Sequence, residues 1–119
     1  MTKLNKNKRV QVNMSILEEA YDFIRSKQKE SNFATLTQFV ANILDDWRIR
    51  GSPDIPSFRK NQYQRRVYIN CYVEQETAVK MYEKSLYFGV SKSRVPSKIV
   101  EKWYISSCNK TETQEEYNG

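Results

Sequence analysis

The sequence contains no histidine and only two cysteines among its 119 residues. The absence of histidine excludes the usual general base, the Ser-His and Cys-His nucleophile pairs and every zinc site that needs an imidazole. Cys71 and Cys108 have neither a Cys-x-x-Cys spacing nor the density of a disulfide scaffold, so we expect two reduced thiols. The sequence therefore predicts no enzyme, no metal site, no cofactor and no small-molecule substrate.

Long apolar runs are absent as well. The composition, 39% hydrophobic and 29% charged, is typical of one globular domain. The first fifteen residues are polar and basic and lack the apolar segment of a signal peptide, and nothing approaches the length of a membrane span. We expect a cytoplasmic protein without a membrane partner.

Positive charge is unevenly distributed along the chain. The net charge is +6, yet residues 1–10 carry +4 and residues 48–66 carry +5, so the remainder is net negative. A charge needed only for solubility would be spread more evenly. Two basic blocks favour surfaces that face a polyanion, with a solvated basic face as the alternative.

The chain contains an internal repeat, because residues 8–47 reappear in outline as residues 65–103. The first copy opens with Arg9-Val-Gln-Val-Asn-Met14 and the second with Arg66-Val-Tyr-Ile-Asn-Cys71, at an offset of 57. Strict alternation predicts a half-buried strand in each copy. The side chains expected to face inward are Val10, Val12, Met14, Val67, Ile69 and Cys71, and those expected to face outward are Arg9, Gln11, Asn13, Arg66, Tyr68 and Asn70.

A first helical pattern follows each strand. Ser15 to Glu18 fits a capping box that would start the helix of copy 1, and the pattern of copy 2 runs from Glu74 to Leu86. Ser31-Asn32 is expected to end the first of these helices and Gly89 the second.

A second helical pattern closes each copy. Its apolar residues in copy 1 are Leu36, Phe39, Val40, Ile43, Leu44 and Trp47, and Val95, Ile99, Val100 and Trp103 match four of them at an offset of 56. The change of offset means that copy 2 lacks one residue, in its first helix or the turn that follows. Pro96 is comfortable only in a first turn, so the last helix is expected to start near Ser93.

These patterns divide the chain into five segments. We expect a basic arm at residues 1–7, copy 1 at 8–47, a linker at 48–64 that contains Gly51, Pro53 and Pro56, copy 2 at 65–108, and an acidic flexible tail at 109–119. One copy alone buries too little surface and leaves its strand unpaired, so the two must pair.

A strand followed by two helices, present twice, resembles the ribbon-helix-helix family of prokaryotic and phage DNA-binding proteins, of the Arc and MetJ type. The resemblance covers residues 8–47 and 65–103 and rests on residue classes rather than fixed letters. Conjugation accessory proteins of the TraY type are a tandem form. It implies a mainly α fold with a two-stranded antiparallel β-ribbon, in the order β-α-α-linker-β-α-α, closed into an intramolecular pseudo-dimer. Pairing between two chains is the open alternative.

The resemblance also implies residue roles. The outward strand residues would read bases in the major groove of double-stranded DNA, and Tyr68 in place of a second glutamine predicts two unlike half-sites. Residues at the helix starts and beside the strands would bind phosphates. The expected base readers are Arg9, Gln11, Asn13, Arg66, Tyr68 and Asn70, and the expected phosphate contacts are Lys6, Lys8, Thr35, Thr37, Lys60, Arg65, Ser91, Lys92 and Ser93.

The expected function is sequence-specific DNA binding by a nucleoid- or plasmid-associated transcriptional repressor or autoregulator, with further self-association on tandem sites. A plasmid relaxosome or partition accessory protein is the alternative within the same class. A protein–protein scaffold with a basic face is the alternative of another class. Duplex RNA ranks third, because its deep, narrow major groove does not admit a ribbon.

Overall fold

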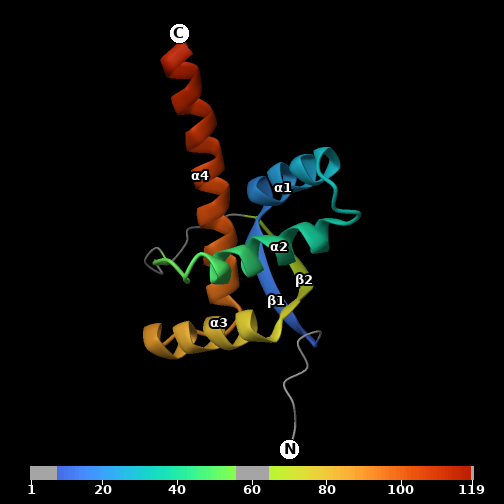
Figure 1. Ribbon diagram of the computed structural model, residues 1–119, viewed down its shortest axis with the longest axis vertical. Coiled ribbons are helices and arrows are strands. Elements are labelled where there is room, and N and C mark those ends of the chain that lie inside the picture. The colour runs from blue at the N-terminus through green and yellow to red at the C-terminus, as the bar shows by residue number, and fades with distance from the viewer. Residues whose placement is uncertain (1–7, 56–64, 119) are drawn as a thin grey trace, which may run out of the picture.

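A computed structural model describes residues 8–55 and 65–118, with side chains described as far as residue 108. It contains one two-stranded antiparallel sheet, called the ribbon below, and four helices (Figure 1). In chain order these are β1 (Arg9–Leu17), α1 (Glu18–Glu30), α2 (Leu36–Ile49), β2 (Arg66–Glu74), α3 (Gln75–Phe88) and α4 (Arg94–Asn118). The predicted arm at 1–7, with Lys6, and the central linker residues 56–64, with Lys60, lie outside the described residues.

The two strands, 57 residues apart in sequence, pair along their whole length. The register runs from Arg9 opposite Glu74 to Leu17 opposite Arg66, with Asn13 opposite Asn70 at the centre. Met14 and Cys71 are buried on the inner face, whereas the other predicted inward residues, Val10, Val12, Val67 and Ile69, are half-buried. Alternation therefore placed one face of each strand against the helices, as period-2 patterning requires.

The predicted capping box at Ser15 is wrong, because β1 continues through Leu17 and α1 begins at Glu18. No side chain caps the start of α1. Ile16 is fully buried on the inner face of the ribbon, and the Glu18 amide donates a hydrogen bond to the Arg65 carbonyl (2.9 Å). Pairing with β2 satisfies more backbone groups of this segment than one helical turn would, which explains the longer strand.

The other predicted helix boundaries agree with the structure, except the end of the last helix. Ser31 follows the end of α1, and Thr35 caps α2 by accepting a hydrogen bond from the Gln38 amide (3.2 Å). Gly89 ends α3 in the left-handed conformation with φ 67°, which favours glycine. Pro96 lies in the first turn of α4, where its missing N–H costs no helical hydrogen bond.

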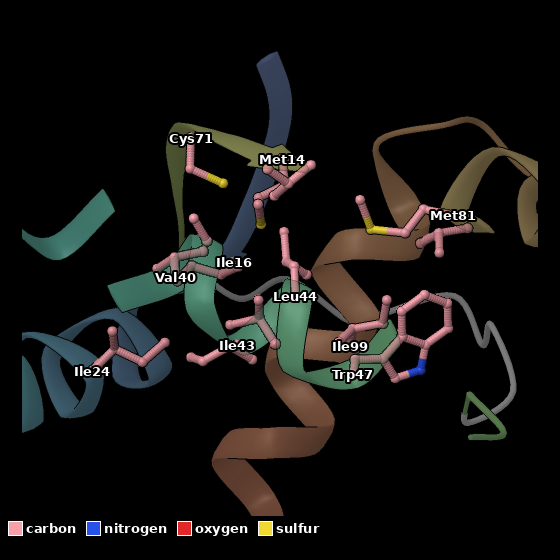
Figure 2. Packing of buried hydrophobic residues seen from close by; sticks show 14 of the residues in the cluster. Met14, Ile16, Ile24, Val40, Ile43, Leu44, Trp47, Cys71, Met81 and Ile99 are labelled. Atoms are coloured by element: carbon pink, nitrogen blue, oxygen red, sulfur yellow. The ribbon is translucent and has the colours of Figure 1, made fainter. Parts of the chain in front are cut away.

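The hydrophobic core lies between the inner face of the ribbon and the apolar faces of α2 and α4. In Figure 2 the side chains of Val40 and Leu44 point from α2 toward Met14 and Cys71 of the strands. Each fully buried aliphatic side chain contributes about 1.5–3 kcal/mol of hydrophobic stabilisation. The buried cluster comprises Met14, Ile16, Ile24, Val40, Ala41, Ile43, Leu44, Trp47, Ile55, Cys71, Val73, Met81, Val95, Ile99 and Val100.

The two tryptophans terminate the core at different places. Trp47 is buried and its indole N–H donates to the Pro53 carbonyl (3.0 Å), which fixes the start of the segment after α2. Trp103 is half-buried, and its ring lies near those of Phe23 (5.9 Å between centroids) and Phe39 (5.6 Å). Both tryptophans therefore serve packing.

Residues 109–118, which the sequence assigns to a flexible tail, continue α4 as a helix to Asn118. This part of α4 projects beyond the other elements in Figure 1. No proline or glycine interrupts the sequence between Pro96 and Gly119, and the segment contains lysine, glutamine and glutamate, which favour helices.

Candidate nucleic-acid interface

The outer face of the ribbon carries four of the six predicted base readers. Gln11, Asn13, Tyr68 and Asn70 are all exposed there, and Tyr68 keeps 88% of its surface accessible. Asn13 and Asn70 form the central cross-strand pair. The structure thus brings together amide and phenol groups from two segments far apart in the sequence, on one exposed surface.

Tyr72 also belongs to this face, although sequence reasoning did not count it among the base readers. It pairs across the ribbon with Gln11, just as Tyr68 pairs with Ser15, and its ring is exposed. Tyr72 was not counted because the strand predicted in copy 2 ended at Cys71. The signal was present, since Tyr72 continues the alternation that Tyr68 and Asn70 begin.

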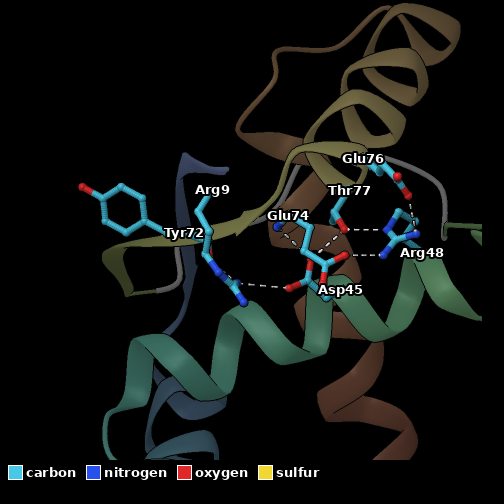
Figure 3. Close-up of polar contacts among 7 residues, drawn as sticks. All are labelled: Arg9, Asp45, Arg48, Tyr72, Glu74, Glu76 and Thr77. Atoms are coloured by element: carbon cyan, nitrogen blue, oxygen red, sulfur yellow. Dashed lines mark hydrogen bonds and ion pairs between the residues drawn. The ribbon is translucent and has the colours of Figure 1, made fainter. Parts of the chain in front are cut away.

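Arg9 lies at one end of the ribbon and turns toward α2. Its guanidinium donates a hydrogen bond to the Tyr72 carbonyl (3.2 Å) and forms an ion pair with Asp45 (3.6 Å). Figure 3 shows this guanidinium directed at Asp45, while the Tyr72 ring points away from it. Because the Arg9 side chain is about half exposed (53%), part of it stays accessible to a ligand on the outer face.

Arg66 is the exception among the predicted base readers, because its guanidinium is held inside the fold. Its Nε donates to the Ser15 hydroxyl (3.0 Å), and its Nη2 donates to the Ser15 carbonyl (3.0 Å) and to Glu101 Oε1 (3.1 Å). Glu101 is buried, and a buried carboxylate needs a countercharge. The prediction that Arg66 faces outward is therefore wrong. Its guanidinium supplies the countercharge to Glu101 and links β2 to β1 and α4.

The two arginine pairs occupy equivalent positions in the two copies. Arg66 and Glu101 follow Arg9 and Asp45 at the repeat offsets of 57 and 56. Asp45 has additional partners, because it accepts hydrogen bonds from the Thr77 hydroxyl (2.6 Å) and the Glu74 amide (3.2 Å), as Figure 3 shows. This sharing of Asp45 leaves Arg9 less tightly held than Arg66.

The predicted phosphate contacts at the helix starts are all exposed. The hydroxyls of Thr35 and Thr37 lie 3.3 Å apart before and within the first turn of α2, and those of Ser91 and Ser93 lie 3.5 Å apart before α4. Backbone N–H groups and the positive end of the dipole make such helix starts suitable for anions. Lys92 adds a positive charge at α4, where its Nζ lies 4.9 Å from the centre of the Tyr82 ring.

A groove lies between the ribbon and each of these helix starts. One, of about 530 Å³, is lined by Arg9 and Tyr72 together with Thr35, Thr37 and other residues of α2. The other, of about 580 Å³, is lined by Gln11 and Asn13 together with Lys92, Ser93 and residues of α3. Predicted base readers and predicted phosphate contacts therefore line shared grooves.

Lys8 and Arg65, the remaining described phosphate candidates, precede the two strands and are both exposed. Because the strands are antiparallel, the two cations lie toward opposite ends of the ribbon. This distribution places positive charge at both ends of the exposed face.

Cys71 is a core residue of β2 with 1% of its surface accessible. Burial, together with the nearby Asp45 carboxylate, raises the pKa of its thiol to about 12. The thiolate is the reactive form, so this side chain is inert at neutral pH.

The part of the chain that the structure describes contains no group of three or more histidine, cysteine, aspartate or glutamate residues arranged to hold a metal ion. Within the same residues, no helix has the length and apolar character needed to cross a membrane. No family model, curated protein or solved structure matches the chain.

Proposed function

We propose that this chain is a sequence-specific double-stranded DNA-binding protein that inserts the outer face of its ribbon into the major groove. The observation that carries the proposal is the exposed row of amide and phenol side chains, flanked on both sides by hydroxyl-bearing helix starts. A major groove about 12 Å wide admits a two-stranded ribbon. The family resemblance of the sequence suggested the same mode of binding.

The architecture within this proposal is a tandem ribbon-helix-helix pseudo-dimer formed inside one chain. The register supports it, because the repeat offset carries Asn13 onto Asn70, and these two residues face each other at the centre of the ribbon. A pseudo-two-fold axis through this pair would exchange the copies. The equivalent ion pairs Arg9–Asp45 and Arg66–Glu101 support the same relation.

Base reading in this proposal centres on the amides. Asn13 and Asn70 can each donate to and accept from an adenine edge, and Gln11 can do the same on one side of the centre. Tyr72 beside Gln11 and Tyr68 beside Ser15 can pack on thymine methyl groups. Because Tyr68 stands where copy 1 has Gln11, and Tyr72 where it has Ser15, the two half-sites are unlike and the operator is an imperfect palindrome.

Phosphate binding would come from the helix starts and from the cations at the ribbon ends. Thr35, Thr37, Ser91, Lys92 and Ser93 would hold the backbone on either side of the groove, and Lys8 and Arg65 would add salt-dependent affinity. Such contacts position the ribbon without selecting a sequence. In the cell, the proposed role is transcriptional repression or autoregulation, with a plasmid relaxosome or partition function as the alternative.

Selection from a random duplex library with the purified protein, at about 150 mM salt, tests the proposal, because non-specific binding is already weakened there. We expect enrichment of a short, imperfectly palindromic sequence. Binding that disappears as salt rises, without enrichment of any sequence, would overturn the proposal.

Asn13→Ala then tests direct reading of a base. Loss of the amide should weaken binding to the selected duplex by about 1–3 kcal/mol and leave binding to random DNA nearly unchanged. Asn32→Ala, at an exposed asparagine in the turn between α1 and α2, is the matched control and should change neither. An equal loss on both duplexes for Asn13→Ala would exclude base reading by this residue.

A further inference from the structure

The outer face of α3 carries an exposed apolar stripe, beside which the structure places the Lys92 ammonium, 4.9 Å from the centre of the Tyr82 ring. Val79, Tyr82 and Leu86 are spaced by three and four residues, so they lie on one side of the helix. They keep 49%, 45% and 64% of their surfaces exposed, and Tyr87 beside them is exposed as well. Isolated exposed apolar residues are common, but a continuous stripe on one helix indicates a contact surface.

The first copy provides an internal control for this stripe. At the offset of 57, the equivalents of Val79, Tyr82 and Leu86 are Asp22, Arg25 and Lys29 of α1, all three exposed. The inner faces of the two helices agree, because Ala20 and Ile24 are buried in α1 as Thr77 and Met81 are in α3. The fold therefore tolerates a charged outer face at this position, so the apolar stripe of α3 calls for a separate explanation.

We propose that the stripe of Val79, Tyr82 and Leu86 is an isologous contact with the α3 of a second copy of this chain. In an antiparallel pair centred near Tyr82, Val79 of each chain faces Leu86 of the other. A surface with apolar residues at both ends of such a stripe is self-complementary under a two-fold axis.

The charges beside the stripe fit the same arrangement. Lys80 and Glu83 are exposed, lie on the outer side of the stripe and form a 3.5 Å ion pair within the helix. When two such helices run antiparallel about Tyr82, Lys80 of one chain lies across from Glu83 of the other, and the reverse. Each chain thus presents opposite charge to its partner on both sides of the axis.

The size of the surface sets the strength of the contact. A few side chains on a helix of 14 residues bury far less than the roughly 1,200–2,000 Å² typical of stable protein complexes, so the association is weak in dilute solution. The charged face of α1 does not repeat the contact, so assembly stops at two chains. Cooperative association rests on the proposed DNA binding. Two chains on adjacent operators would associate cooperatively, because the duplex raises their effective concentration.

Sedimentation equilibrium of the full chain without DNA, from about 10 µM to about 1 mM, tests the contact over the range expected of a weak interface. The weight-average mass should rise toward twice the monomer mass. Leu86→Lys, which installs the residue type of the α1 equivalent, should weaken association at least about tenfold, the effect of one lost 1.4 kcal/mol contact. Ile49→Lys, at an exposed apolar residue at the end of α2, is the matched control and should associate like the wild type.

A charge exchange tests the antiparallel geometry. Lys80→Glu alone should weaken association through repulsion between the chains, and Lys80→Glu combined with Glu83→Lys should restore it. A wild type that stays monomeric over the whole range would overturn the proposal. Equal weakening by Leu86→Lys and Ile49→Lys, or no rescue by the double exchange, would overturn it as well.

Binding to a duplex with a single operator separates this proposal from the proposed function. Leu86→Lys should bind such a duplex as the wild type does and lose cooperativity only on two adjacent operators. If no operator sequence is selected at all, the DNA-binding proposal fails while the sedimentation result stands on its own.

Discussion

The contacts between the two copies differ on the two sides of the molecule, although they join equivalent elements. Where α2 meets the start of α3, the contact is polar: Arg48 binds Thr77, Glu74 and Glu76 (2.9, 2.6 and 3.0 Å). Where α4 meets α1, the contact is aromatic, since Phe23 lies against Trp103 and Tyr104. Tyr104 occupies the position of Arg48 at the offset of 56.

This difference shows which positions of the repeat are constrained by packing and which can change their chemistry. Several buried positions of the core stay apolar in both copies, as Leu44 and Val100 do. The contacts at the periphery have changed chemistry, because a polar network and an aromatic cluster can each fill the same gap between two helices. Close packing constrains volume and polarity in the core more strongly than at its rim.

Truncation of the equivalent core residues should have the largest effect on stability. Leu44→Ala should lower the free energy of unfolding by about 2–5 kcal/mol, and Val100→Ala should lower it less because fewer buried carbon atoms are lost. Urea unfolding followed by circular dichroism measures both. Equal losses in the free energy of unfolding would mean that the core is packed more tightly around Val100 than around Leu44.

Replacing Arg66 should mainly reduce stability, whereas replacing Arg9 should mainly reduce DNA affinity. Arg66→Ala removes the closer of the two described countercharges of the buried Glu101, the other being Lys98 (3.5 Å), so unfolding should become easier by about 2–4 kcal/mol. Arg9→Ala should cost less than about 1 kcal/mol, because its ion pair is partly solvated and Asp45 keeps two other donors.

Urea unfolding and affinity for the selected duplex, measured side by side, check this pair of variants. The expected order is a larger loss of stability for Arg66→Ala and a larger loss of affinity for Arg9→Ala. A reversed order would show that Arg66 reaches the DNA after all.

Making the outer faces of the strands alike should remove the asymmetry of the operator. Tyr68→Gln matches Gln11, and Tyr72→Ser matches Ser15, so the double variant presents the same outer residues from both copies. The duplex selected by this variant should be a more nearly perfect palindrome. The free energy of base preference at the positions that the altered residues contact should change by about 1–3 kcal/mol. An unchanged selected sequence would exclude both tyrosines from base reading.

The smallest effect concerns Cys71, which stands where copy 1 has Met14. Burial raises the pKa of its thiol from 9.0 to about 12, so an unfolded chain ionises first as pH rises. The stability linked to this thiol is therefore complete below about pH 9 and declines between pH 9 and 12. Unfolding free energies measured against pH should fall more steeply above pH 9 for the wild type than for Cys71→Ala.

Most of the secondary structure could be predicted because its signals are local. Alternation marked the strands, the spacing of Leu36 to Trp47 marked α2, and Gly89 and Pro96 marked a helix end and a helix start. The sequence also indicated that the two copies differ by one residue. The burial pattern follows the offset of 57 as far as Gln28 and Ser85, so the missing residue lies after the first helix, at the turn.

The predictions that failed concerned competition between local and long-range partners. Ser15 carries a good local capping signal, but its backbone pairs with Tyr68 and its side chain with Arg66, both more than 50 residues away. Tyr72 was not counted among the base readers for a related reason: pairing with β1 makes the strand longer than its most regular stretch of sequence. Local propensity cannot predict which distant segment will supply hydrogen bonds.

The sequence by itself determined the two copies, the alternation that gives the ribbon an apolar and a polar face, and the positions of most helix ends, because these depend on residues close along the chain. Only the tertiary structure decided that Asn13 meets Asn70, that Arg66 turns inward to Glu101 while Arg9 stays half exposed, and that the apolar stripe of α3 remains exposed. Those outcomes depend on which distant groups come into contact, and a buried charge or backbone group takes whichever partner the fold supplies.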